Sequence, residues 1–302
     1  MSRSVPLHLR RRALVLAVGA VVVGACAQEA SAPAGVDSGS GGLVAGDEPD
    51  LGAVIEATRA AESAAVVLNL EVEAPFGGGN LELDGDVSQD DVGTVVGSVD
   101  GDDGASYAIE ARADGDTAWI TSDAPGFADA LPRDATWVEG SVDELRDDDI
   151  WTGLDTTFDV LSVLRGVDGL TEAGTTEVGG DELRLFEGDV DWEAALDACD
   201  PEERAALEQT ITLTGDAEMR TFTVDLGVDD EDIVRLLQVE IVAGPPADEA
   251  EDMPFGDELT MRVGLEVESL GHDVEEPEAP PADETVPISE VPEVAEMLAE
   301  GL

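Results

Sequence analysis

Apolar and polar residues alternate with a period of two in several segments after residue 65, and this alternation predicts strands that bury one face. The apolar positions of five such segments are Val66, Leu68, Leu70 and Val72; Leu81, Leu83 and Val87; Tyr107, Ile109 and Ala111; Phe222, Val224, Leu226 and Val228; and Leu259, Met261, Val263, Leu265 and Val267. Gly- and Asp-rich clusters at 114–116 and 229–232 separate strand segments and indicate hairpin turns. The pattern predicts a large antiparallel sheet with one apolar face.

Helical spacing of apolar residues occurs in three segments. Asp50 is a suitable N-cap for a helix that carries Leu51, Val54, Ile55 and Thr58 on one face. The second helix is predicted to start at Asp155, to bury Phe158, Leu161 and Leu164, and to end at Gly166. The third covers 191–210 and restarts at Asp200-Pro201, because proline suits a first helical turn. Helices that interrupt a sheet give the α+β class.

The N-terminus has the pattern of an export signal. Arg3 and Arg10–Arg12 precede an apolar stretch at 13–23, which is shorter than the roughly 20 residues of a membrane span. The sequence Val23-Gly24-Ala25-Cys26 resembles a bacterial lipobox, so residues 1–25 are predicted to be cleaved and Cys26 to carry acyl chains such as palmitate. An ordinary secretory signal followed by a chance cysteine is the alternative. The Sec and twin-arginine export routes both remain open.

The rest of the chain divides by composition. Residues 26–47 are rich in Ala, Ser, Gly and Pro and predict a flexible tether, and residues 48–290 form one predicted domain. From Asp273 the proline density predicts an extended strap on the surface, and 291–302 form a short helix or tail. With two or more acyl chains on Cys26, the protein would be stably anchored at the extracytoplasmic face of the cell membrane.

The charge of the chain is strongly negative. Its 14 basic residues are all arginine, against 71 acidic residues, and loss of residues 1–25 lowers the formal charge from −57 to −61. Such a surface repels phosphate backbones and anionic head groups, which excludes nucleic acid as a partner and leaves the lipid as the membrane anchor. Because acidity is spread over every segment, we favour adaptation to salt over dedicated cation binding as its explanation.

Candidate chemistry is sparse. His8 and His272 are the two histidines, so a histidine-based catalytic triad or zinc site is not expected, and we predict no enzyme activity, metal or cofactor. The acidic turn 100–104 has glycine where a calcium loop of the EF-hand type needs its fifth oxygen ligand. Cys199 shares a helical face with Trp192, Ala195 and Leu196 and is expected to lie in the core.

The order of these elements resembles the actinobacterial LppX/LprG lipoprotein family. The resemblance covers about residues 48–290 and rests on the lipobox, the tether, the helix leading into a strand, and a set of short motifs in fixed order. These motifs are Asp116-Thr117-Ala118-Trp119-Ile120, Trp137-Val138-Glu139, Val178-Gly179-Gly180-Asp181-Glu182-Leu183, the 220–242 hairpin with Ile233-Val234-Arg235, and Ala279-Pro280-Pro281.

The resemblance implies a LolA/LolB-like half-barrel sheet, curved around a few helices, with an apolar cavity that binds acylated lipid or glycolipid for transport through the cell envelope. An envelope transporter would be a further partner. Candidate cavity-lining residues are Val66, Leu68, Leu70, Val72, Tyr107, Ile109, Phe158, Leu161, Phe222, Val224, Leu226, Met261, Val263 and Leu265. The alternatives are that these residues fill a dry core, and that the protein is an anchored interaction or sensor module.

Overall fold

The computed structural model describes residues 49–299 apart from 75–76, 102–103, 133, 143–144, 146–157, 159, 201–203, 205–206, 208–217 and 245–258. The predicted signal, Cys26, the tether and the helix start at Asp155 lie outside the described residues. Within the described part of the chain, no helix is both long and apolar enough to cross a membrane.

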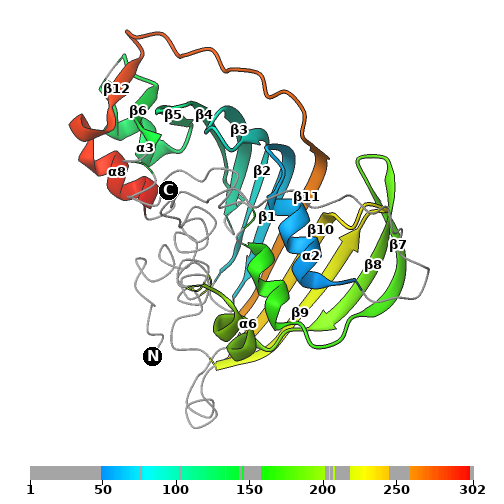
Figure 1. Ribbon diagram of the computed structural model, residues 1–302. Coiled ribbons are helices and arrows are strands. Elements are labelled where there is room, and N and C mark those ends of the chain that lie inside the picture. Colours follow the sequence, from blue (N-terminus) through cyan, green and yellow to red (C-terminus); the bar gives the residue numbers. More distant parts are fainter. Residues whose placement is uncertain are drawn as a thin grey trace, which may run out of the picture.

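One open sheet dominates the fold (Figure 1). Its strands are β1 (Ser63–Glu73), β2 (Gly79–Ser88), β3 (Gly93–Gly101), β4 (Ser106–Asp114), β5 (Thr117–Ser122), β6 (Trp137–Ser141), β7 (Thr171–Val178), β8 (Asp181–Asp189), β9 (Glu218–Val228), β10 (Val234–Gly244), β11 (Leu259–Leu270) and β12 (Thr285–Pro287). The order across the sheet is β12-β6-β5-β4-β3-β2-β1-β11-β10-β9-β8-β7. The large sheet with a few helices confirms the predicted α+β class, and the five alternating segments are β1, β2, β4, β9 and β11.

The sheet is mixed, so the expectation of a purely antiparallel sheet is wrong at one edge. Strand β12 runs parallel to β6, with Val286 paired to Val138. A parallel pair needs a long crossover connection. The extended strap after β11 provides it, because this segment carries the chain along the sheet to the far edge (Figure 1). Arg112 holds the strap by donating from Nη1 to the Glu278 carbonyl oxygen at 2.8 Å.

The helices are short and lie in two groups. On the apolar face, α2 (Leu51–Arg59), the 3₁₀ helix η1 (Val160–Gly166) and α6 (Trp192–Ala198) lie over the part of the sheet around β10 and β9 (Figure 1). Near β6 and β12 lie α3 (Pro125–Ala130), η3 (Ile288–Glu290) and α8 (Pro292–Ala299). The helix expected to end at Gly166 does end there, but its described part is 3₁₀ rather than α.

Side-chain hydrogen bonds dock α2 onto its neighbours. Asp50 caps the helix by accepting from the Ala53 backbone N–H at 3.2 Å, as predicted. Thr58 is fully buried, and its Oγ1 accepts from the Val234 N–H at 3.0 Å at the start of β10. Arg59 donates from Nη2 to Ser162 Oγ at 2.7 Å, which links α2 to η1. The helix is therefore fixed both to the sheet and to its helical neighbour.

Gly166 allows η1 and α6 to pack closely. A Cβ atom at this position would lie 2.3 Å from the Asp191 carbonyl oxygen and 2.7 Å from the Ala195 Cβ. Asp191 is the N-cap of α6 and accepts from the Ala194 N–H at 3.0 Å. A side chain at 166 would therefore push the two helices apart at the point where they cover the sheet.

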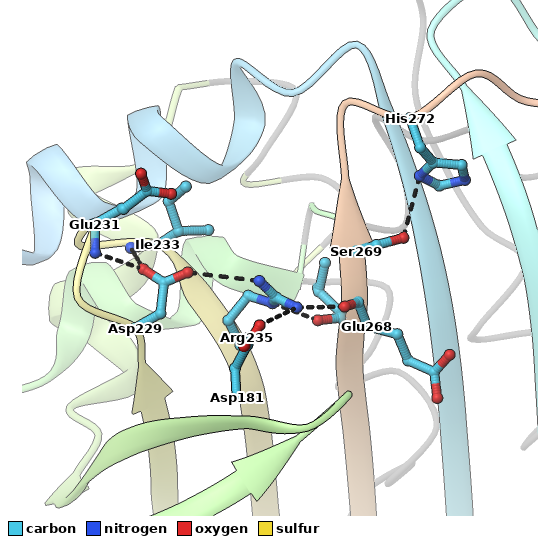
Figure 2. A network of polar contacts seen from close by, with 9 residues as sticks. Asp181, Asp229, Glu231, Ile233, Arg235, Glu268, Ser269 and His272 are labelled. Carbon is cyan, nitrogen blue, oxygen red and sulfur yellow. Dashed lines mark hydrogen bonds and ion pairs between the residues drawn. The ribbon is translucent and has the colours of Figure 1, made fainter.

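Arg235 joins three parts of the sheet at one end (Figure 2). This arginine is 8% exposed, and its Nε donates to the Val267 carbonyl oxygen at 2.5 Å while Nη2 donates to that of Glu268. Its guanidinium also pairs with Asp229 in the β9–β10 turn at 3.5 Å and with Asp181 at the start of β8 at 3.6 Å. The side chain of Asp229 is itself only 13% exposed.

We expect Arg235→Met to lower the free energy of unfolding by about 3 kcal/mol, because it removes the cationic partner of the largely buried Asp229 carboxylate and the donor to the Val267 and Glu268 carbonyl oxygens. Urea denaturation of the two proteins measures the difference. Arg204→Met is the matched control, since the Arg204–Asp197 pair is much more exposed and such pairs contribute about 0–1 kcal/mol. Equal losses in the two variants would contradict the clamp role of Arg235.

Candidate functional site

The candidate site is the apolar face of the sheet, on which all the strand residues proposed from the sequence lie. The register shows this directly, because one continuous row of paired positions crosses eight strands from β4 to β8. That row consists of Ile109, Gly97, Leu83, Leu68, Leu265, Leu237, Leu226 and Phe186. A face with this composition is stable in water only where something apolar covers it.

Most of the proposed cavity-lining residues are buried in the core beneath α2, η1 and α6. Each of them is less than 9% exposed: Val66, Leu70, Val72, Phe158, Leu161, Phe222, Val224, Leu226, Met261 and Leu265. Full burial of one such side chain contributes about 1.5–3 kcal/mol to stability. These residues form one continuous cluster with the helices, so they act as core where the helices lie.

Four proposed residues are only partly buried, namely Leu68, Tyr107, Ile109 and Val263. Leu83 on β2 and Val95 on β3 share this partial burial on the same face. We call the set Leu68, Leu83, Val95, Tyr107 and Ile109 the apolar stripe. Sequence reasoning did not select Leu83 or Val95 as lining residues, although Leu83 alternates with Glu82 and Asp84 in the same way; Val95 is followed by Val96 and carries no such signal.

The apolar stripe lies where two separate core clusters meet the sheet. The first cluster joins β1–β3 and β8–β11 to α2, η1 and α6, and Leu68, Leu83 and Val95 pack at its border. The second cluster joins β4–β6 and β12 to α3 and α8, and Tyr107 packs at its border. Ile109 belongs to neither cluster. The apolar face is thus continuous across the sheet, whereas the buried cores of the described residues are not.

Glycines on the apolar face allow β2 and β3 to approach and bend beneath the stripe. A Cβ atom at Gly97 would lie 2.0 Å from the Glu82 carbonyl oxygen and 2.7 Å from Leu83 Cδ2, and one at Gly85 would lie 2.3 Å from the Thr94 oxygen. Glycine inside a strand is typical of a tight bend or a close backbone approach. At Gly85 and Gly97 the apolar face therefore has no side chain, and the sheet can curve at the expense of side-chain packing.

The opposite, convex face is polar and strongly charged. Arg262 lies at its centre and donates to Glu71 Oε2 at 2.9 Å and to Glu240 Oε2 at 2.8 Å, and these bonds raise the pKa of the guanidinium above its ordinary value. A hollow of about 490 Å³ beside it is bounded by Asn69, Gln238 and other polar groups. It forms where Gly264 leaves a gap in the row of side chains.

Asp225 borders this hollow and is the carboxyl group with a raised pKa. Partial burial is the main cause, and the nearby negative charges of Glu187 and Glu240 add to it. Both neighbours lie on adjacent strands, β8 and β10, so the sheet itself gathers these like charges. The resulting repulsion is a cost of the folded state.

The structure brings Asp86, His272 and Ser269 into a hydrogen-bonded array that sequence reasoning did not anticipate. His272 Nε2 lies 2.8 Å from Asp86 Oδ1. Its Nδ1 lies 3.1 Å from Ser269 Oγ, a contact that Figure 2 shows. The three residues meet because β1 pairs with both β2 and β11, which places Asp86 and Ser269 on either side of Ala65 despite their separation in sequence.

The hydrogen bonds of this array anchor the start of the strap, the extended segment that follows β11. In a Ser-His-Asp protease the serine contacts Nε2 of the histidine and the aspartate contacts Nδ1. Here the contacts are reversed, because Asp86 contacts Nε2 and Ser269 contacts Nδ1. Ser63 Oγ donates to the His272 carbonyl oxygen at 2.5 Å, and the Gly271 N–H donates to the Ser63 oxygen at 2.9 Å. These bonds fix the chain where it leaves β11.

Comparison with solved structures gives several mycobacterial and LolA-like neighbours. LprF from Mycobacterium bovis is 16% identical with a TM-score of 0.42, and the match covers 76% of this chain and 94% of that one. LppX from Mycobacterium tuberculosis, a lipoprotein, is 15% identical with a TM-score of 0.38 over 74% and 94% of the two chains. Both are proteins of the LppX/LprG family. The family to which the sequence motifs pointed is thus represented among the structural neighbours.

A LolA superfamily protein from Nitrosomonas europaea, NE2245, is 9% identical with a TM-score of 0.21, covering 76% of this chain and 94% of that one. No family model matches the chain, and no curated protein matches its sequence.

We expect Asp225→Asn to raise the melting temperature at neutral pH. Between the ordinary pKa of 3.8 and its raised value in the folded state, the folded protein binds more protons at this group than the unfolded chain does. Stability therefore falls as the pH rises through that window, and the loss is complete above the folded pKa. The gain from the substitution should accordingly vanish below pH 3.8.

Differential scanning calorimetry across this pH range measures the effect. Asp84→Asn is the matched control, because Asp84 is an exposed carboxylate on the same convex face. It removes the same charge from the chain without removing a partly buried carboxyl group. An equal gain in both variants would assign the effect to net charge instead of to the surroundings of Asp225.

Proposed function

We propose that the chain is a lipid-anchored extracytoplasmic lipoprotein that binds and carries an acylated lipid or glycolipid on the apolar face of its sheet. The anchor is Cys26 in the lipobox-like sequence, and residues 26–47 tether the domain to the membrane. The family neighbours, among them the lipoprotein LppX, are consistent with this role.

The observation that carries the proposal is the apolar stripe. Its side chains are neither fully buried nor part of one joined core, although they lie in the middle of the sheet and not at an edge. Elsewhere in the described residues, exposed large apolar side chains are nearly absent, Val96 at 44% being the exception. An acyl chain laid along the stripe would remove this area from water, at about 0.8 kcal/mol for each buried methylene group.

A filled core is the second candidate, and the burial of most proposed lining residues favours it. On that view the protein is an anchored interaction or sensor module, and the stripe is completed by the protein itself. The two functions differ in whether the purified protein contains lipid.

We expect Cys26→Ala to release the protein from the membrane. A protein with two or three acyl chains stays at the membrane, whereas this acidic chain has no other attraction to anionic lipid. Fractionation of cells that express each form, followed by immunoblotting, measures the shift. A Cys26→Ala protein that still sediments with membranes would contradict anchoring through this residue.

Mass spectrometry of organic extracts tests the carrier function. The mature chain, residues 26–302 with Cys26→Ala, is purified from its own host, and we expect close to one lipid per protein. Ile109→Asp should strongly reduce the bound lipid, because it places a charge in the apolar stripe. Ala108→Asp is the matched control, since Ala108 is the neighbouring exposed residue on the opposite face of β4.

A protein free of lipid, together with failure to bind added lipids, would favour the interaction module. If the wild-type protein contains lipid and Ile109→Asp retains it fully, the cargo lies elsewhere than on the stripe. The melting temperatures of both variants show whether the fold is intact.

A further inference from the structure

Arg184 is a cation on the apolar face of the sheet. It lies on β8, pairs with Val228 on β9, and shares its face with Phe186 two residues along the strand. Its guanidinium carbon lies 5.1 Å from the centre of the Phe186 ring, and Phe186 is a core residue with 2% exposure. Both terminal nitrogens, Nη1 and Nη2, are buried and have no hydrogen-bond partner.

Arg112, Arg235 and Arg262 are paired, by contrast. Arg112 also stacks on an aromatic ring, that of Trp137 at 4.7 Å, but it pairs with Glu110 at 2.7 Å. Arg235 and Arg262 each bind two or more acidic side chains. In a chain with 71 acidic residues, a carboxylate partner for Arg184 would be easy to provide, so its unpaired state is specific to this position.

The contacts of Arg184 within the protein leave its hydrogen-bonding groups unused. Stacking on Phe186 stabilises the charge through the face of the guanidinium, but the N–H donors lie in its plane and need acceptors there. Buried polar groups almost always have such acceptors, and an exception indicates a missing partner. Asp232 Oδ1 is also buried without a partner, but it lies in the β9–β10 turn and does not pair with Arg184.

We propose that Arg184 binds the oxyanion group, carboxylate or phosphate, of an acyl lipid held on the apolar face, with the head group at β8 and therefore apart from the apolar stripe on β1–β4. This inference rests on the proposed lipid-carrier function and adds the chemical class of the head group. The planar guanidinium can donate two parallel hydrogen bonds to either oxyanion. Burial strengthens this attraction, because the interaction of two charges grows as the effective dielectric constant falls.

Titration calorimetry with three probes tests the proposal on the mature chain, residues 26–302 with Cys26→Ala, stripped of lipid. The probes are palmitate, monopalmitoylglycerol and inorganic phosphate, the amphiphiles being kept below their critical micelle concentrations. We expect palmitate to bind about 10- to 100-fold more tightly than monopalmitoylglycerol, the range that charge-assisted hydrogen bonds supply. Phosphate alone should bind at least as weakly as the uncharged amphiphile.

Arg184→Met should reduce the palmitate affinity to that of monopalmitoylglycerol and leave the latter unchanged. Arg184→Lys should be intermediate, because it keeps the charge but loses the paired donors. The matched control is Arg112→Met, which removes a stacked but paired arginine from the convex side and should change neither affinity. The melting temperature of ligand-free Arg184→Met should equal or exceed that of the wild type, since a buried unpaired charge is removed.

Several results would overturn the inference. If both amphiphiles bind equally well and Arg184→Met changes nothing, the head-group site is refuted while the carrier function stands. If neither amphiphile binds the wild-type protein, the carrier function fails and the inference with it. Tight, Arg184-dependent binding of phosphate alone would assign the site to a free anion. An Arg184→Met protein that does not fold would make Arg184 a structural residue.

Discussion

Hydrophobic contact between one face of the sheet and the elements that cover it is the interaction on which the fold depends. The apolar row from Ile109 to Phe186 crosses eight strands, which is more surface than three short helices can cover. The chain meets this constraint with two covers: α2, η1 and α6 over one half, and α3 and α8 over the other. Because the covers are separate, the middle of the face is only partly buried by the described residues, and there the proposed lipid site lies.

The convex face must instead remain stable in contact with water. Carboxylates crowd it, and the sheet brings like charges together, as at Asp225, Glu187 and Glu240. Arginines placed at the centre and at one end offset part of this repulsion: Arg262 links β11 to β1 and β10, and Arg235 links β10 to β11 and two turns. Each of these two arginines bridges several strands instead of forming a single isolated pair.

The strands and the apolar face could be predicted from sequence because they depend on local alternation. The helix cap at Asp50 was likewise readable, since a cap involves residues only three apart. The parallel pairing of β12 could not be predicted, because it depends on where the strap carries the chain. The same limit hid the Asp86–His272–Ser269 array. In both cases residues distant in sequence meet only through strand order, which alternation does not determine.

Alternation also could not predict which residues of the apolar face are buried in the core and which form the partly exposed apolar stripe. Leu70 and Leu68 have the same pattern on β1, yet Leu70 is 1% exposed whereas Leu68 is partly exposed. The difference arises from what packs above each residue, and the sequence carries no local record of that. Gly85 and Gly97 were the available signal, because two glycines on the apolar face of neighbouring strands indicate a bend where packing is sacrificed.

Acidity and membrane attachment are compatible because they act over different lengths. The tether predicted for residues 26–47 has a root-mean-square span of about 25 Å if it behaves as a flexible chain. Repulsion between the acidic domain and anionic head groups is screened within about 8 Å at physiological ionic strength. The tether is longer than that range, so the charge does not oppose the anchor. The charge only disfavours close, non-specific contact with the membrane. A cargo lipid would then have to enter through the apolar face, because the carboxylates of the sheet lie on the convex face.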